Sequence, residues 1–214
     1  MLDKSLIFKN IIMRIDSHAV LNSCDPVLSD GLSFRFFSGT EDIKNWARIE
    51  AAVLEFNSEV EAAEYFEKSY VPHTDELENR CIFVVNQAGL PVATATAWFA
   101  DSELGHQASL HWVAVHPDYQ GLGTGSALVQ KCLLIFRELE PGCDVWLHTQ
   151  TWSHVAVRMY HKLGFNLMKT ARLANMNTRN GITKIYENDF SQALEILQNV
   201  LTEKALLELT ETAL

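Results

Sequence analysis

The sequence predicts a mixed α/β fold, of the α+β kind, in which a mostly antiparallel sheet is flanked by helices. Three observations support this prediction. Short apolar runs typical of strands alternate with longer stretches that have helical spacing. Turn residues join the strands of the first half of the chain, which favours antiparallel pairing. In the second half a strand, a glycine-rich loop, a helix and another strand follow one another, as in a right-handed parallel unit.

Length and composition restrict the classes of protein to which the chain can belong. Its 214 residues predict one domain with a sizeable core, and 17 basic against 27 acidic residues give a net charge of −10. Such an acidic chain would repel nucleic acid. No apolar run reaches the length of a membrane span, and the first residues lack a signal-peptide pattern, so we expect a cytoplasmic protein without a membrane partner. The scattered cysteines and histidines predict free thiols and no metal.

The first part of the chain predicts an extension followed by two helices. Residues 1–31 are expected to form an N-terminal extension with short strands at 6–8 and 11–15. A domain over residues 32–190 then opens with a strand at 33–37, and Thr40 is expected to cap the next helix. A second helix begins at Ser58, with Glu61 at the capping-box spacing, and Pro72 ends it.

The remaining elements are predicted in order along the chain. Strands are expected at 81–85 and 91–98, joined as a hairpin, then at 110–115 before the glycine-rich loop and at 145–150 after its helix. A last hairpin is expected from 167–170 and 183–186. Residues 191–214 are expected to form a C-terminal helix capped by Ser191 and ending near Leu209, which either docks on the domain or joins two copies as a homodimer.

The loop has the sequence Gln120-Gly-Leu-Gly-Thr-Gly125 and leads directly into a helix. Glycines accept positive φ and carry no side chain, so several backbone N–H groups can converge on one small volume. A helix that begins near Thr124 adds unpaired N–H groups and the positive end of its dipole. The loop therefore predicts a site for a phosphate or a pyrophosphate.

Two common phosphate-binding patterns fit this loop poorly. A nucleotide-triphosphate loop requires lysine and then serine or threonine after the last glycine, whereas Ser126 and Ala127 follow here. A dinucleotide fingerprint requires a third glycine where Ser126 stands, and the acidic residue available for the ribose, Asp144, precedes a strand rather than ending one. The pattern Gln/Arg-x-x-Gly-x-Gly/Ala after a short strand fits better.

With this loop the chain resembles the GNAT acetyltransferase superfamily. A second block supports the resemblance, because Ala156, Tyr160, Gly164 and Phe165 reproduce the Ala-x-x-x-Tyr-x-x-x-Gly-Phe ending of a later helix in that family. The resemblance implies a GNAT-like sheet and binding of acetyl-CoA as co-substrate. It also implies transfer of the acetyl group to a primary amine of a small molecule or a peptide, by direct attack in a ternary complex.

The resemblance further implies roles for individual residues. Tyr160 would protonate the departing thiolate, and Ser153 stands where the family commonly has an asparagine that binds the pantetheine arm. The strand before the loop would splay from its neighbour and offer backbone groups to the pantetheine, and the loop would hold the pyrophosphate. The expected cofactor-binding residues are Val113, Ala114, Val115, Gln120, Gly121, Leu122, Gly123, Thr124, Gly125, Ser126, Ser153 and Tyr160.

The expected general base is His111, on the strand from which the family often draws a glutamate base. Ser109, His111 and Val113 are expected to share one face of that strand by its period of two. His148 and a chain of water molecules are alternatives. The acidic residues between Glu50 and Glu67 are either a solvated helix face or, by the resemblance, one wall of the acceptor site, where acid would suit a cationic amine.

Two other classes of function remain open at this point. A noncatalytic regulatory module that binds acyl-CoA would keep the loop but would not need a tyrosine acid. Another enzyme could use the loop for the phosphate of a different cofactor. The sequence specifies neither the amine acceptor nor the length of the acyl chain.

Overall fold

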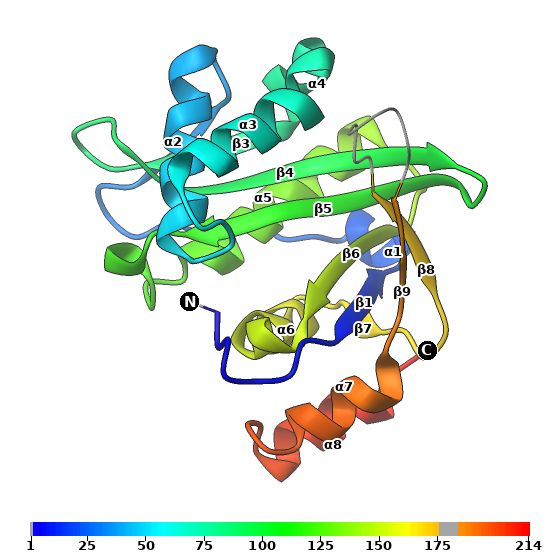
Figure 1. Cartoon of the computed structure of the whole chain (residues 1–214). Coiled ribbons are helices and arrows are strands. Elements are labelled where there is room, and N and C mark those ends of the chain that lie inside the picture. Colours follow the sequence, from blue (N-terminus) through cyan, green and yellow to red (C-terminus); the bar gives the residue numbers. More distant parts are fainter. Residues whose placement is uncertain (1, 176–183) are drawn as a thin grey trace.

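The computed structural model describes residues 2–175 and 184–214, and its centre is a seven-stranded sheet (Figure 1). The strands are β1 (Asn10–Ile15), β2 (Ser33–Phe36), β3 (Cys81–Val85), β4 (Pro91–Ser102), β5 (Gly105–Val115), β6 (Val145–Gln150), β7 (Asn166–Leu167), β8 (Arg172–Asn175) and β9 (Lys184–Glu187). The strand order is β2-β3-β4-β5-β6-β1-β7, and β8 pairs with β9 in a separate hairpin. Only the β5–β6 pair is parallel among the described strands. The predicted fold class is confirmed.

Helices cover both faces of this sheet. They are α1 (Ser17–Leu21), α2 (Thr40–Ala52), α3 (Glu59–Ser69), α4 (Thr74–Arg80), α5 (Thr124–Leu139), α6 (His154–Lys162), α7 (Phe190–Leu197) and α8 (Glu203–Glu211), with 3₁₀ turns η1 (Val71–His73), η2 (Pro117–Tyr119) and η3 (Thr151–Ser153). One apolar cluster joins α5 to the sheet through Leu128 and Phe136, and a second joins α2 and α3 to the opposite face through Trp46 and Phe66. Burial of these two faces supplies most of the stability of such a layered fold.

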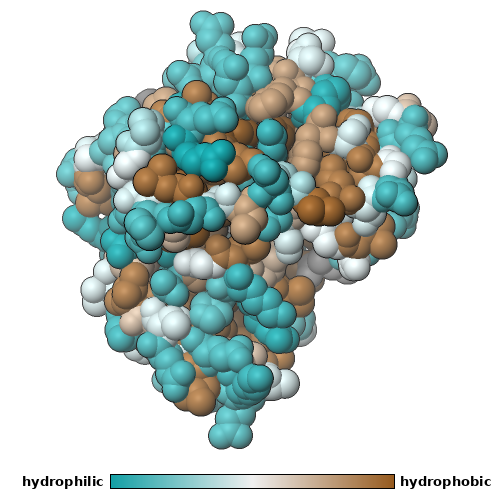
Figure 2. All heavy atoms as spheres, turned by 180° about the vertical axis from the view of Figure 1, so that it is seen from behind, coloured by the Kyte–Doolittle hydropathy of each residue, from teal (hydrophilic) through white to brown (hydrophobic). Residues whose placement is uncertain are grey.

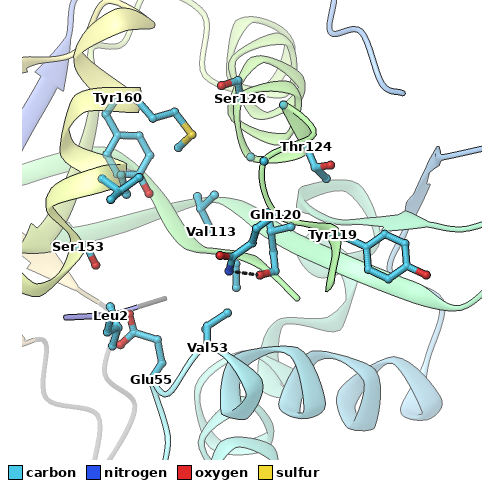
Figure 3. A pocket seen from close by; sticks show the side chains of 18 residues that line it. Leu2, Val53, Glu55, Val113, Tyr119, Gln120, Thr124, Ser126, Ser153 and Tyr160 are labelled. Atoms are coloured by element: carbon cyan, nitrogen blue, oxygen red, sulfur yellow. Dashed lines mark hydrogen bonds between the residues drawn. The ribbon is translucent and has the colours of Figure 1, made fainter. Parts of the chain in front are cut away.

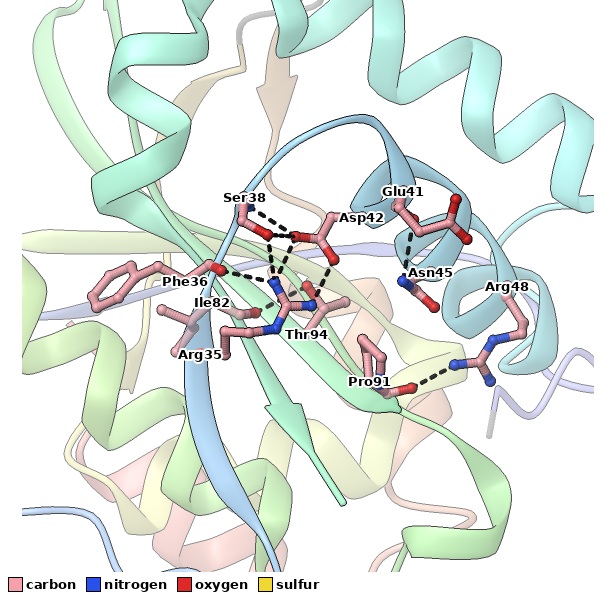
Figure 4. A network of polar contacts seen from close by, with 10 residues as sticks. All are labelled: Arg35, Phe36, Ser38, Glu41, Asp42, Asn45, Arg48, Ile82, Pro91 and Thr94. Atoms are coloured by element: carbon pink, nitrogen blue, oxygen red, sulfur yellow. Dashed lines mark hydrogen bonds and ion pairs between the residues drawn. The ribbon is translucent and has the colours of Figure 1, made fainter. Parts of the chain in front are cut away.

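The start of α2 is held by an ion pair between the partly exposed Arg35 and the buried Asp42 (Figure 4). The guanidinium of Arg35 donates to both carboxylate oxygens of Asp42, at 2.7 and 2.6 Å, and the N–H of Ser38 donates to one of them at 2.8 Å. Burial raises the pKa of Asp42, but the bonds from Arg35 and Ser38 outweigh burial and hold that pKa below its ordinary value. Asp42 thus ties the start of α2 to the segment that precedes it. The predicted Thr40 cap is wrong, since Thr40 is the first helical residue and Gly39 holds the cap position.

The second predicted helix start is confirmed. The hydroxyl of Ser58 accepts from the N–H of Glu61 at 3.1 Å, as a capping box requires. The carboxylate of Glu61 returns not to Ser58 but to the N–H of Asn57, at 3.2 Å. Beyond α3, the turn η1 and the short helix α4 lead into β3, and neither was predicted.

The N-terminal segment contributes a strand to the main sheet. β1 lies between β6 and β7, with Ile12 opposite His148 and Met13 opposite both Leu147 and Leu167. The side chains of Ile12 and Met13 are fully buried. The strand predicted at 11–15 is confirmed, whereas residues 6–8 form no strand because they pass along η3, where the indole of Trp152 donates to the carbonyl of Leu6 at 2.7 Å. The division of the chain at residue 31 stays a prediction.

The C-terminal part differs from the prediction in two respects. The first strand of the last hairpin is β8, at 172–175, because Leu167 belongs to β7 and pairs with β1. The residues that connect β8 to β9 lie outside the described residues. The single helix predicted after residue 191 is two helices, since the hydroxyl of Thr202 accepts from the N–H of Ala205 at 3.3 Å and starts α8. Asp189, not Ser191, holds the cap position of α7.

The surface of the described chain mixes apolar and hydrophilic side chains. Figure 2 shows both kinds interspersed over the face seen from behind. Within the described ranges, no helix combines the length and the apolar character needed to cross a bilayer.

Candidate active site

The site begins where two neighbouring strands diverge. β5 and β6 pair only from Ala108 opposite Val145 to Leu110 opposite Leu147. Beyond Leu110 the two strands separate, so residues 113–115 of β5 have no partner strand on the β6 side. No described strand covers this edge, and the side-chain amide of Gln120 donates to the carbonyl of Val115 at 2.8 Å. The edge therefore offers backbone groups of residues 113 and 114 to a ligand.

A β-bulge in β5 causes part of this divergence. Thr96 of β4 lies opposite His111, but Thr94 lies opposite Ala114, so β5 carries one extra residue there. Within the bulge, Trp112 adopts a left-handed backbone conformation with φ 52°. The bulge reverses the alternation of side chains, and Val113 packs with the α5 cluster while Trp112 packs with the α2–α3 cluster. The predicted face shared by Ser109, His111 and Val113 is therefore wrong for Val113.

The glycine-rich loop has the geometry of an anion site. Gly121 and Gly123 have φ of 77° and 78°, and α5 begins at Thr124, as predicted. Among the described residues, none accepts a hydrogen bond from the N–H groups of 122–126, and the buried hydroxyl of Thr124 has no partner. A Cβ added at Gly121 or Gly123 would meet no atom within 4 Å, so the space above the loop is open. These donors fit a pyrophosphate.

Two adjoining pockets meet beside this loop. The first encloses about 300 Å³ between the loop, β5 and α6 (Figure 3), and the second about 290 Å³ between β5, β6 and the end of α2. Of the expected cofactor-binding residues, all except Leu122 line the first pocket. Leu122 is half exposed, and its carbonyl accepts from the hydroxyl of Ser29 at 3.1 Å. Both pockets are lined by Glu55, Val113, Ser153, Ala156 and Tyr160.

Tyr160 lies on α6 at the junction of the two pockets, with its ring directed toward Val113 (Figure 3). Its side chain is 7% exposed. Burial, followed by the carboxylates of Glu55 and Glu50, raises the pKa of Tyr160 above its ordinary value. The phenol therefore keeps its proton at neutral pH and can act as an acid. The side chain of Met159 on α6 packs closely on Gly125 of the loop. A Cβ added to Gly125 would lie only 3.2 Å from the Met159 sulfur.

His111 lines the second pocket, but both of its ring nitrogens are occupied. The hydroxyl of Tyr70 lies 2.8 Å from Nδ1, and the hydroxyl of Ser109 lies 2.8 Å from Nε2. Burial, and then the nearby His148, lower the pKa of His111 to about 3. These contacts keep the imidazole neutral and leave it no free lone pair, which disfavours the predicted role as general base.

His148, the alternative base, is also held in place. Its Nε2 lies 2.8 Å from Oδ1 of Asn10, and its ring stacks on Tyr186 with centroids 3.8 Å apart. Burial, followed by the positive charge of Lys184, lowers the pKa of His148 to about 4. The ring forms a flat wall of the second pocket.

Two carboxylates of the acidic stretch between Glu50 and Glu67 lie in these pockets, although the sequence did not distinguish them from the other acidic residues of that stretch. Glu50, at the end of α2, is 1% exposed and lines the second pocket, and Glu55 lines both. Burial, and then Glu55, raise the pKa of Glu50 well above its ordinary value. The spacing of Ile43, Trp46 and Glu50 was the available signal, since it places Glu50 on the apolar face of its helix.

A comparison with known protein families shows the family to which the chain belongs. The profile of the acetyltransferase (GNAT) family matches residues 43–165, more than half of the chain. The chain belongs to the GNAT acetyltransferase family. The matched range runs from α2 to the end of the α6 block and contains the splayed strands, the loop and Tyr160. Enzymes of this GNAT family use acetyl-CoA as co-substrate, and the open loop with its unpartnered donors fits the pyrophosphate of that molecule.

Solved structures of the GNAT family share the fold. An N-acetyltransferase from Sphaerobacter thermophilus, described as GCN5-related, superposes with a TM-score of 0.58 at 18% identity, over 76% of this chain and 49% of that one. A GNAT acetyltransferase from Colwellia psychrerythraea superposes with a TM-score of 0.54 at 14% identity, over 75% of this chain and 54% of that one. A tandem GNAT protein from the clavulanic acid biosynthesis pathway gives 0.55 at 19% identity, over 74% and 50%. The chain spans about half the length of these proteins. No curated protein matches it.

A group of potential metal ligands lies outside the GNAT site. Atoms of His106, Glu140 and Cys143 come within 4.8 Å of one another. The ring of His106 already bonds Asp101 and Glu140, at 2.8 and 2.9 Å, and Arg80 pairs with Glu140 at 2.8 Å. His106 and Glu140 of this group are thus already paired with each other and with Asp101 and Arg80.

Proposed function

We propose that the chain is an acetyl-CoA-dependent N-acetyltransferase, in which a primary amine attacks the acetyl thioester directly within a ternary complex. The observation that carries the proposal is the meeting of two pockets at Val113 and Tyr160. The first pocket ends at an anion-binding loop and suits the donor, and the second is lined by carboxylates and suits a cationic acceptor. The two substrates would thus meet beside an acid.

The donor would be held mainly by backbone groups. The N–H groups of the loop from Gly121 to Ser126 would bind the pyrophosphate, and the hydroxyl of Thr124 would add one more donor. The free edge of β5 at 113–115 would pair with the pantetheine amides, and Ser153 lies on the opposite wall of the pocket. One N–H of this edge would face the acetyl oxygen and stabilise the oxyanion.

In the reaction, the amine nitrogen bonds to the carbonyl carbon, and the carbonyl electron pair moves to oxygen. Collapse of that oxyanion re-forms the carbonyl and breaks the carbon–sulfur bond, and the nitrogen releases its surplus proton to solvent. The phenol of Tyr160 gives its proton to the departing thiolate and regains one from solvent. A phenol suits this step because burial, and then Glu55 and Glu50, raise the pKa of Tyr160, so that it holds its proton until the basic thiolate forms.

Titration calorimetry with acetyl-CoA, NADH and ATP tests the choice of donor. Selective binding of acetyl-CoA is expected. Binding of NADH or ATP without acetyl-CoA would instead favour another phosphate-cofactor enzyme. Thiol release with a panel of primary amines then separates the enzyme from a noncatalytic acyl-CoA-binding module, which would bind acetyl-CoA and transfer nothing.

Substitution of Tyr160 by phenylalanine tests the acid. We expect kcat for thiol release to fall by about 10²–10⁴-fold, because one positioned proton donor is lost. Affinity for CoA should stay unchanged, since Tyr160 is already buried and no described residue bonds its hydroxyl. Tyr119→Phe is a matched control, because that residue lines the first pocket with its hydroxyl directed away from Val113 (Figure 3). An unchanged kcat in Tyr160→Phe would exclude the acid role.

A further inference from the structure

We propose that Glu50 is the residue that receives the amino group of the acceptor and removes its proton, and that the second pocket selects an ammonium group carried on a flat apolar body. This inference rests on the proposed N-acetyltransferase function and adds a catalytic residue and a class of acceptor to it. It begins from Glu50, whose Oε1 has no hydrogen-bond partner among the described residues.

Glu50 is buried, and one of its two carboxylate oxygens lacks a described partner. Its side chain is 1% exposed, and its Oε1 has no hydrogen-bond partner among the described residues. An unpaired carboxylate in such a place destabilises a fold, since burial removes the water that would solvate its charge. The other buried acid of the same helix, Asp42, is fully paired with Arg35 and Ser38 (Figure 4). The two ends of α2 thus differ, and a ligand cation would supply the missing partner at Glu50.

The charged and titratable groups around Glu50 are mainly acidic or neutral, and Lys184 is the cation among the described residues that line the second pocket. Burial, and then Glu55 on the same segment, raise the pKa of Glu50. Burial is likewise the main cause that raises the pKa values of Tyr65, Tyr70 and Tyr160, and Glu50 adds a smaller effect in the same direction. The pocket also contains His111 and His148, which are neutral, and Lys184 on β9, beside the ring of Tyr186. A cation that enters this surrounding would be attracted to Glu50 and Glu55.

The walls of the second pocket indicate the rest of the acceptor. They include Trp112, the stacked rings of His148 and Tyr186, and Phe8. Aromatic faces bind flat apolar groups and attract cations. A primary amine on a short chain with an aromatic end matches this combination of a deep carboxylate and flat walls.

The proton balance is consistent with one released proton. Glu50 takes a proton from the ammonium, and the neutral amine attacks the thioester. After collapse, the second surplus proton of the nitrogen leaves to solvent, and Tyr160 protonates the thiolate and is reprotonated. Glu50 then returns its proton to solvent. One ammonium and acetyl-CoA thus give one amide, one thiol and one proton. Burial, and then Glu55, raise the pKa of Glu50, which favours its acceptance of a proton from the ammonium.

The test compares 2-phenylethylamine with 2-phenylethanol, which has the same shape and no ammonium group. Calorimetry of the protein saturated with CoA should show the amine binding about ten- to 100-fold more tightly than the alcohol, as expected for a hydrogen bond to a charged group. Glu50→Gln should abolish this preference and lower kcat for thiol release with the amine by about 10²–10⁴-fold. Glu50→Asp should keep part of the amine preference and part of kcat. Glu67→Gln, at an exposed residue of α3, should change neither the preference nor kcat.

Several outcomes would overturn the inference. These are an amine preference that survives in Glu50→Gln, no amine preference in the unaltered protein, or a lower melting temperature of Glu50→Gln, since a carboxylate without a partner should not stabilise the fold. Binding of CoA is measured first with each variant. If the unaltered protein fails to bind CoA, the proposed function itself fails. If CoA binds and the amine preference does not depend on Glu50, only the inference about Glu50 fails.

Discussion

At the scale of the residue, burial decides the chemistry of groups that the sequence presents as equivalents. His111 and His106 lie five residues apart on β5, yet burial lowers the pKa of His111 to about 3, while the carboxylate of Asp101, helped by Glu140, raises the pKa of His106. Glu50 and Glu67 also differ in burial, since Glu50 lies in the second pocket and Glu67 is exposed. Helical spacing can place a residue on a buried face, but only the packed fold shows whether a hydrogen-bond or ion-pair partner lies beside it.

His111 should make the fold sensitive to acid. Its pKa is lower in the folded state than the ordinary 6.5, so the unfolded chain binds more protons between pH 6.5 and about 3. Stability should therefore be complete above pH 6.5 and fall as the pH drops, by at most about 1.4 kcal/mol per pH unit from this group. Urea unfolding between pH 4 and 7 should show a smaller slope for His111→Gln than for the control His18→Gln. Equal slopes would contradict the buried, neutral imidazole.

At the scale of the element, the local motifs were predictable and the irregular ones were not. The loop, the start of α5 at Thr124 and the Ser58 cap follow from neighbouring residues, and all three are confirmed. The bulge at Trp112 depends on the pairing of β5 with β4 and on the aromatic rings that receive the indole. A strict period of two could not reveal it, and for that reason the expected position of Val113 was wrong.

The loop glycines offer a prediction at this scale. Gly123→Ala places a Cβ at φ 78°, where nothing within 4 Å blocks it, so the cost is backbone strain of about 1–2 kcal/mol. Gly89→Ala is a matched control, because Gly89 has φ 77° and equally open surroundings but lines neither pocket. Thermal unfolding should show similar losses for both variants. Calorimetry should show weaker CoA binding for Gly123→Ala alone, and equal CoA affinity in both would argue against a pyrophosphate at the loop.

At the scale of the whole molecule, a charged cluster ties together the far ends of several elements. His106, Asp101, Glu140 and Arg80 connect the β4–β5 turn with the ends of α4 and α5. The pKa of His106 is raised in the folded state. The contribution of His106 to the free energy of unfolding is therefore complete below pH 6.5 and is lost as the pH rises through the higher folded pKa. Melting temperatures measured across that range should decline less in His106→Gln. A decline that the substitution leaves unchanged would show that the cluster does not titrate there.

The N-terminal segment should be essential to the fold. β1 buries Ile12 and Met13 between β6 and β7, so its removal exposes two strand edges and part of the core. A variant that lacks residues 1–16 should lose cooperative thermal unfolding by circular dichroism and calorimetry. Removal of residues 1–5 alone should keep it, because those residues precede the strand. Cooperative unfolding after the longer deletion would support residues 1–31 as a separable extension.

The position of β1 also has a consequence for how the protein folds during its synthesis. Its first residue, Asn10, pairs with Gln150, which the ribosome adds 140 residues later. At about 5–20 residues per second, the strand waits roughly 7–30 s for its partner. During that time an apolar segment is exposed beside the ribosome, and the sheet closes only when both partners have emerged. Non-local pairing of this kind slows folding and creates a period in which a chaperone can bind the nascent chain.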